Sequence, residues 1–259
     1  MKVRNLIPSE RISDYVDRIL TIEHNDITVP VSLPLFANGS PTLVFTSTRG
    51  TIRNNSKAHL ILFGQTILPD TINFTDDFTL IAYFFRPYSL LTVFGVVAGE
   101  LTDKPIDLHL LASHKINELQ EQLLNSDTLE KRIHLLDNYI FGLISVTRTD
   151  CPIIKYVTTK IVHDPSTRVL GLVQKELHVT ERTFQRLFEK NIGMAPNVYR
   201  RVCQFNNAFQ QLNNRNFHRL TDIAYENGYT DQSHYIRAFR EFTNLTPKDY
   251  LNLGSPPQG

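Results

Sequence analysis

Two short sets of polar side chains near the C-terminus have the chemistry needed to recognise base edges in duplex DNA. They are Arg182, Gln185 and Arg186 in the first set and Gln232, Ser233 and Arg237 in the second. An arginine pairs with O6 and N7 of guanine, a glutamine pairs with N6 and N7 of adenine, and a serine suits either base. Each set falls on the polar side of an expected helix whose opposite side is apolar. We therefore predict that both sets face outward and read bases.

Cations close to these two sets suit the phosphate backbone, whose contacts fix the register of a protein on DNA without reading sequence. The expected phosphate contacts are Lys190, Arg200, Arg201, Arg240 and Lys248. Charged residues are also distributed unequally between the front and back parts of the chain. Residues 1–150 hold 13 Lys and Arg against 17 Asp and Glu, whereas residues 151–259 hold 14 against 9. A basic back part behind an acidic front part indicates nucleic-acid binding by the back part.

The elements that must position these side chains occur twice, at a constant offset of 51 residues. Thr180 recurs as Asp231 and Phe188 recurs as Phe239, with an apolar helix pattern and a tight turn before each pair. Threonine and aspartate are N-cap residues, and Gly228 adopts the positive φ of a turn at little cost. The repeat predicts two helix-turn-helix units, at about 169–190 and 220–242.

The stretch "PNVYRRVCQFNNAFQQLNN" between the two units predicts one linking helix of about 17 residues, which spans about 26 Å at the rise of an α-helix. With the bodies that it joins, such a helix can hold the two recognition helices about 34 Å apart, which is one turn of DNA. We expect both polar faces to lie on one side of the molecule.

The front part predicts an α+β protein with a small antiparallel barrel or sandwich. Strand patterns fill much of residues 41–87, with "GQTILPDTINFTDD" as a loop or hairpin region. A helix that ends at Gly99 follows, and then two amphipathic helices with apolar stripes. Those stripes either pack on their own domain or form a self-association surface. The pattern breaks near 145–152, so the predicted domains are 1–150 and 151–259.

The back part resembles AraC-type (AraC/XylS family) transcriptional regulators over about residues 152–251. The segments that carry the resemblance are "VTERTFQRLFEKNIGMAPNVY" and "LTDIAYENGYTDQSHYIRAFREFTNLTPKDY". The front part resembles the N-terminal domain of a subgroup of these regulators through "ISDYVDRI", "SLPLFANGSPTLVF", "LFGQ" and "FFRPYSLLTVFGVVAGELTDKPIDL". The chain departs from the family pattern at Val173, Ala195, Gln204 and Asn244.

The resemblance implies a cytoplasmic, bacterial-type transcription factor whose two units bind double-stranded promoter DNA. It adds Glu181 and His234 as contacts at the rim of the DNA interface. It also implies that the front domain senses a small-molecule effector or forms a homodimer, and that an activating member contacts RNA polymerase. The effector, the operator and the direction of regulation stay open.

Two other functions compete with DNA binding. An enzyme would need a catalytic constellation, yet the sequence shows no metal-ligand spacing, no nucleophile motif and no cofactor-binding loop. Cys151 and Cys203 are expected to be buried thiols in a reducing compartment. The sequence contains no run of 18 apolar residues, so we predict no membrane-spanning helix. A protein-interaction module of two helical hairpins is the other alternative. Salt dependence separates it from DNA binding, because phosphate contacts weaken steeply with salt.

The front domain has enough aromatic surface to line an effector pocket or to fill a solid core. The residues in question are Phe36, Phe45, Phe63, Tyr83, Phe84 and Phe85. Arg86 has two comparable interpretations, since its guanidinium suits an anionic ligand or an ion pair within the protein.

Overall fold

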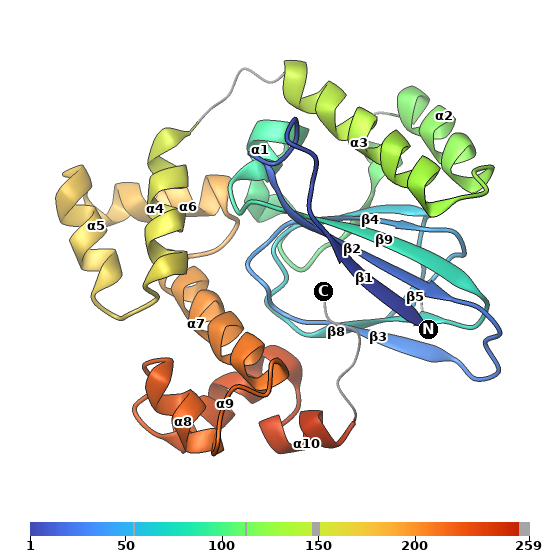
Figure 1. The fold of residues 1–259 in the computed structure, drawn as a ribbon. Helices are drawn as coiled ribbons and strands as arrows, with labels where there is room; N and C mark the ends of the chain where they lie inside the picture. The colour runs from blue at the N-terminus through green and yellow to red at the C-terminus, as the bar shows by residue number, and fades with distance from the viewer. Residues whose placement is uncertain (54, 112, 147–150, 254–259) are drawn as a thin grey trace.

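The structure, a computed structural model, describes residues 1–53, 55–111, 113–146 and 151–253. A two-sheet front part is joined to a helical back part (Figure 1). The strands are β1 (Lys2–Leu6), β2 (Val16–His24), β3 (Val31–Leu35), β4 (Thr42–Thr46), β5 (Thr51–Ile52), β6 (Asn55–Ser56), β7 (Leu60–Phe63), β8 (Asp70–Phe74), β9 (Phe78–Phe85) and β10 (Ile106–Asp107). This architecture confirms the predicted α+β class.

All paired strands of the front part run antiparallel, in two sheets. The larger sheet has the order β1-β2-β9-β4-β7-β10 and the smaller sheet has the order β3-β8-β5-β6. Alternate residues of a strand face opposite sides, so Leu20 of β2 and its partner Ala82 of β9 both enter the core between the sheets. The smaller sheet covers one face of the larger sheet and leaves the other face for helices.

Three strands at the start of the chain were missed by the sequence patterns, and β8 lies within the region that they predicted as a loop or hairpin. Pro34 interrupts the pattern of β3, which pairs only with β8 and is an edge strand. Proline is tolerated at an edge because its missing N–H faces away from the neighbouring strand. The long strand β2 contains Asp17 and Arg18, whose charges obscure its apolar positions. Its place is set by pairing with the distant β9.

Helices α1 (Ser89–Phe94), α2 (Ser113–Leu124) and α3 (Leu129–Val146) cover the free face of the larger sheet (Figure 1). The predicted stripes of the two longer helices enter the core there, for Ile116, Leu136 and Ile140 are fully buried. These stripes therefore pack on their own domain. The first helix ends at Gly95, whose φ is +68°, and not at the predicted Gly99; a 3-10 turn, η1 (Ala98–Glu100), follows.

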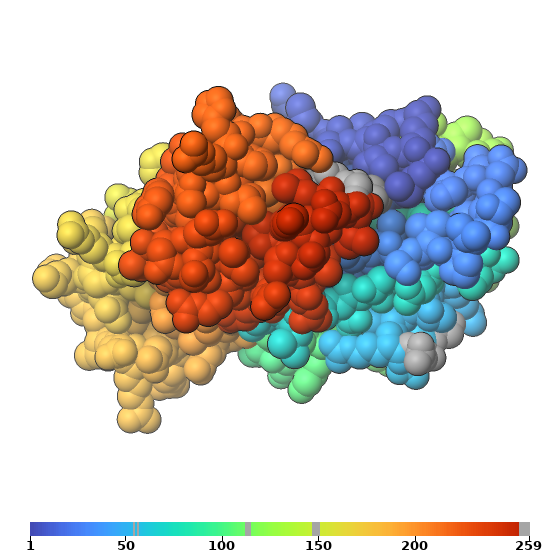
Figure 2. Space-filling view, turned by 90° about the horizontal axis from the view of Figure 1, so that it is seen from below, coloured from blue at the N-terminus to red at the C-terminus, as the bar shows by residue number. Residues whose placement is uncertain are grey.

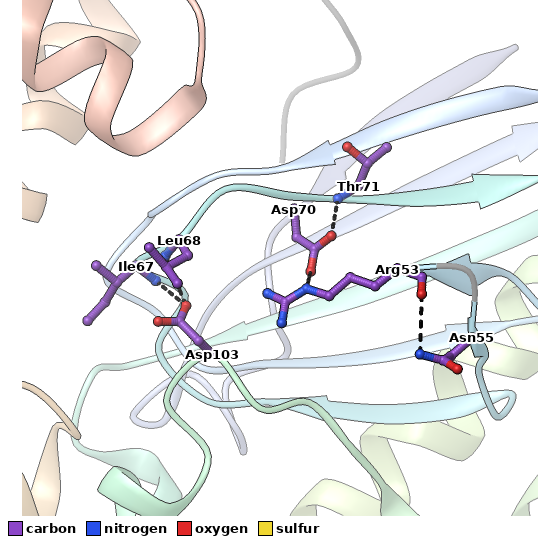
Figure 3. A network of polar contacts seen from close by, with 7 residues as sticks. All are labelled: Arg53, Asn55, Ile67, Leu68, Asp70, Thr71 and Asp103. Carbon is purple, nitrogen blue, oxygen red and sulfur yellow. Dashed lines mark hydrogen bonds and ion pairs between the residues drawn. The ribbon is translucent and has the colours of Figure 1, made fainter.

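Polar contacts fix the loops at one end of the two sheets. The carboxylate of Asp103 accepts hydrogen bonds from the backbone N–H groups of Ile67 and Leu68, at 2.8 and 3.0 Å (Figure 3). In the same region Arg53 forms an ion pair with Asp70, with 2.7 Å between Nε and Oδ2 (Figure 3). The loop that carries Ile67 is thereby tied to the segment that follows η1.

The back part consists of α4 (Pro152–His163), α5 (Val169–Leu177), α6 (Glu181–Asn191), α7 (Pro196–Asn213), α8 (Leu220–Glu226), α9 (Gln232–Thr243) and α10 (Pro247–Asn252). Its core also includes Ala37 and Tyr88 of the front part. Figure 2 shows the orange and red residues of the last helices lying directly against the blue strands of the sheets. The predicted domain boundary stays a prediction, because residues 147–150 lie outside the described residues.

Candidate nucleic-acid interface

The first helix-turn-helix unit consists of α5 and α6, at the predicted position. The side chain of Thr180 accepts a hydrogen bond from the N–H of Thr183 at 3.2 Å, so the predicted N-cap is present. Phe184 and Phe188 of α6 are buried and leave the opposite side of the helix in solvent. The exposed side carries all four predicted polar residues, namely Glu181, Arg182, Gln185 and Arg186.

The second unit consists of α8 and α9 and has the same plan. Gly228 in the turn has a φ of +74°, and the carboxylate of Asp231 accepts a hydrogen bond from the N–H of His234 at 2.8 Å. Tyr235 and Phe239 are fully buried. Asn244, which replaces the glycine usual in the family, takes the left-handed conformation with φ of +61° and ends α9.

The outward side of α9 shows a graded exposure. Ser233 and Arg237 are exposed and Gln232 is half-buried. His234 is also half-buried, because its ring packs edge-on against Tyr229 with 5.2 Å between the centroids. The structure therefore brings five of the six predicted base-reading side chains fully to the surface, and the sixth, Gln232, partly.

The linking helix α7 joins the two units, which lie at its opposite ends (Figure 1). Its 18 residues span about 27 Å at 1.5 Å per residue. An aromatic cluster fixes its C-terminal half to the second unit, since Phe205 and Phe209 lie 5.7 and 5.9 Å from Phe239, between ring centroids. At the N-terminal end, Tyr199 contacts Phe188 of the first unit at 5.9 Å. One helix thus belongs to both cores.

The predicted phosphate contacts divide into two groups. Lys190, Arg240 and Lys248 are exposed, and none of them belongs to an ion pair within the described ranges. Arg201 is partly exposed, pairs with Glu241 and lies over the ring of Phe242. All four side chains are therefore at the surface of the back part, Arg201 only in part.

Arg200 is a correction to the sequence interpretation. The residue is only 7% exposed, and its guanidinium donates to the backbone oxygen of Pro165 at 2.8 Å and to Gln204 Oε1 at 3.1 Å. Burial also lowers the pKa of this guanidinium below its usual value. Arg200 therefore ties α7 to the segment between α4 and α5, and its guanidinium is already engaged within the protein. Gln204 in turn donates to the backbone oxygen of Asn227 at 2.9 Å, so its role is structural too.

A cavity of about 120 Å³ lies where α7 and α10 meet the sheets. Its walls come from β2, β4, β7, β8, β9, residues 33–38, Thr66, α7 and α10, so no local pattern could have indicated it. Of the six aromatic residues considered for a pocket, Phe36, Phe63 and Phe84 line the cavity. The other three, Phe45, Tyr83 and Phe85, are core residues between the larger sheet and its helices.

Other groups that could have indicated a ligand site or catalysis have structural surroundings. Arg86 pairs with Asp17, with 2.6 Å between Nη1 and Oδ1. Burial raises the pKa of the Cys203 thiol to about 12, so the thiol is protonated at neutral pH. Within the described ranges, no three His, Cys, Asp or Glu side chains are grouped as metal ligands would be. None of the helices in the described part of the chain has the length and apolar character needed to cross a membrane.

Sequence and structure comparisons agree with this geometry. Residues 173–252 match a family model described as "Helix-turn-helix domain", and residues 4–107 match one described as "Domain of unknown function (DUF6597)". No curated protein sequence matches the chain. The two units on one linking helix define a helix-turn-helix DNA-binding protein.

Solved structures of ToxT from Vibrio cholerae have the same fold over nearly the whole chain. One covers 98% of this chain and 99% of ToxT at 10% identity, with a TM-score of 0.51. A second, bound to (E)-4-(8-methylnaphthalen-1-yl)but-3-enoic acid, has the same coverage at 11% identity and a TM-score of 0.52. A third, bound to an unsaturated fatty acid, covers 96% of this chain and 93% of ToxT at 12% identity, with a TM-score of 0.50. Residues 173–252 are therefore a DNA-binding domain of the AraC/XylS type, and the chain as a whole has the fold of ToxT.

Proposed function

We propose that this regulator binds one promoter site through both helix-turn-helix units at once, with α6 and α9 in adjacent major grooves. The observation that carries the proposal is the duplicated plan, with capped recognition helices at opposite ends of one shared helix. Both helices expose arginine together with amide or hydroxyl groups, which are the groups that recognise bases. The proposed base readers are Arg182, Gln185, Arg186, Gln232, Ser233 and Arg237.

The surface cations supply the part of the binding energy that does not depend on sequence. The proposed phosphate contacts are Lys190, Arg201, Arg240 and Lys248, with Glu181 and His234 at the rim. Arg201 reaches a phosphate only by leaving Glu241 or by holding both, so its contribution is smaller than that of the unpaired lysines. Such contacts release counterions, and the affinity falls as salt rises.

The front part modulates this binding, through a small molecule in the cavity or through a homodimer. The cavity favours the first route, because Phe209 lines it and also contacts Phe239 of the second recognition helix at 5.9 Å between ring centroids. An occupant would therefore touch a side chain that packs on a DNA-reading helix. The ToxT structures that hold small molecules support this comparison. We place the regulator in the cytoplasm, where an activator would also contact RNA polymerase.

Selection of bound sequences from a random DNA pool, followed by substitutions in the protein, tests the division into base readers and phosphate contacts. Arg186→Ala and Arg237→Ala should each lose about 1–3 kcal/mol of discrimination at one base pair, at positions separated by about one DNA turn. Lys248→Ala is the matched control; it should weaken selected and random DNA alike and flatten the salt dependence.

Two outcomes of this experiment would contradict the proposal. If all three variants behaved alike on selected and random DNA, the proposed readers would not read bases. If no sequence were enriched and any DNA binding were insensitive to salt, the helical hairpins would serve a protein partner instead.

A further inference from the structure

The charge of the cavity walls limits the chemistry of an occupant. The twenty lining residues include no Asp, Glu, Lys, Arg or His. Most are aliphatic or aromatic, and the polar ones are three amides, two threonines and a tyrosine: Asn38, Asn206, Gln210, Thr42, Thr66 and Tyr250. A carboxylate taken into such surroundings would lose its water without gaining a cation, at a cost of several kcal/mol.

The two arginines closest to these walls along the chain do not change this conclusion. Arg18 lies beside the lining residue Phe84, with its guanidinium carbon 3.8 Å from the ring centroid, but it does not line the cavity. Arg86 follows β9 and is held by Asp17 at 2.6 Å. Within the part of the chain that the structure describes, an acidic occupant would therefore have no ion-pair partner in contact with it.

The same walls offer unused hydrogen-bonding groups. Asn206 and Gln210 are four residues apart on α7, so they lie on the same side of the helix, and both line the cavity. Thr66 lines it from the loop after β7. Among the described residues, none of these three side chains has a hydrogen-bond partner. An amide both donates and accepts, and so does a hydroxyl, which matches a neutral head group that does the same.

The size of the cavity sets the scale of the apolar part. A dry protein cavity of about 150 Å³ lined by Leu, Ile and Phe binds benzene. The present cavity, at about 120 Å³, has similar walls of Leu, Ile and Phe. It therefore suits a body close to one six-membered ring, and the rest of a longer molecule would have to extend out of it into solvent.

We infer that the cavity takes a small, neutral, ring-sized molecule with one hydroxyl or amide group, which Asn206 and Gln210 orient. This inference rests on the proposed modulation by a small molecule and gives that molecule a chemical class. It sets the protein apart from the ToxT structures, whose bound molecules are carboxylic acids.

Benzyl alcohol, benzamide and benzoate test the inference because they share a ring and differ in the charge and donors of the head. Titration calorimetry of the full chain at pH 7 should give Kd values for the alcohol and the amide at least about tenfold below that of benzoate, or about 1.4 kcal/mol. Benzoate binding as tightly as the two neutral compounds would overturn the inference. So would the failure of all three to bind at millimolar concentration.

Substitutions then locate the binding. Gln210→Met keeps the length of the side chain and removes its amide, so the affinity for benzamide should fall about tenfold while that for toluene stays the same. Ala82→Val narrows the cavity from β9 and should weaken all the ring compounds, with circular dichroism checking the fold. Unchanged binding in both variants would place the site elsewhere and overturn the inference.

Calorimetry without DNA separates this inference from the proposed function. If the neutral compounds bind but leave DNA affinity unchanged, the ligand class stands and modulation through the cavity fails. If DNA affinity responds only to long-chain acids, modulation stands and the ligand class is wrong.

Discussion

The two helix-turn-helix units share one plan, but they are attached to the front part by different kinds of contact. The first unit is held by a polar link, since the Thr102 hydroxyl donates to the backbone oxygen of Gly193 at 2.6 Å, directly beyond the end of α6. The second unit packs on the C-terminal half of α7, and that half of α7 contacts the front part through apolar side chains, among them the rings of Phe36 and Phe209, whose centroids lie 5.7 Å apart.

This difference in attachment suggests different roles for the two units, one fixed relative to the sheets and one able to move. A short hydrogen bond to a backbone oxygen has one geometry, so it fixes the first recognition helix relative to the sheets. An apolar contact beside a cavity is non-directional and changes with what fills the cavity. We therefore expect the first unit to serve as the reference and the second unit to respond to a ligand.

The largest effect should come from emptying the aromatic core of either unit. Phe239→Ala and Phe188→Ala should each lower the free energy of unfolding by about 3–5 kcal/mol, measured in denaturant, since both rings are fully buried. The two should differ at the cavity, because only Phe239 contacts the cavity-lining rings of Phe209 and Tyr250. Equal loss of toluene binding in both variants would contradict the proposal that only the second unit is coupled to the cavity.

Two glycines with positive φ, Gly193 at the attachment of the first unit and Gly228 in the turn of the second unit, separate close packing from backbone strain alone. A Cβ at Gly193 would lie 2.6 Å from Thr102 Oγ1 and 2.7 Å from the backbone oxygen of Ala98, whereas at Gly228 the nearest atom, Gln204 Nε2, is 3.7 Å away. Gly193→Ala should therefore destabilise by more than about 2 kcal/mol, through strain and displacement of backbone. Gly228→Ala should cost only the strain, about 1–2 kcal/mol. Denaturant unfolding of both variants checks the order, and the reverse order would contradict a tight attachment of the first unit.

The polar link itself should have a smaller effect. Thr102→Val removes the hydroxyl that donates to Gly193 and keeps the shape of the side chain, so the stability should fall by about 1 kcal/mol. Amide hydrogen exchange should speed up at the C-terminal end of α6 and stay unchanged in α9. Faster exchange in both recognition helices would show that the two attachments are not independent.

The smallest effect that we predict is a loss of stability of α10 in acid, in the helix that carries the cavity-lining residue Tyr250. The Thr246 hydroxyl and backbone N–H donate to Asp249, and they lower the pKa of this carboxyl from its usual value. Its contribution to stability is therefore present above the unfolded pKa of about 3.9 and is lost as the pH falls through the lower folded value. Below about pH 4 the protection of α10 amides, taken relative to the intrinsic exchange rate at each pH, should fall in the wild type, and Asp249→Asn should remove this pH dependence. An unchanged profile in the variant would assign the acid sensitivity to another group.

The second unit could be predicted from the sequence because every signal in it is local. The cap at Asp231, the turn at Gly228 and the buried rings of α9 lie within a few residues of one another. The first strands could not be predicted in this way, since β2 is specified by its pairing with β9, some sixty residues later. Arg200 shows the same limit within the interface, because its burial depends on Pro165 in a different segment. The cavity is the extreme case, with walls from both ends of the chain.

The continuity of α7 has a consequence for the operator. Adding one residue to this helix would turn everything after it by about 100° and advance it by 1.5 Å. A flexible connection would let the protein follow binding sites with different gaps between their halves, whereas a continuous helix built into both cores imposes a single gap. The length of α7 therefore sets the spacing between the two half-sites in a promoter that this protein recognises. Insertions between the half-sites should weaken binding as much as changes to the bases themselves.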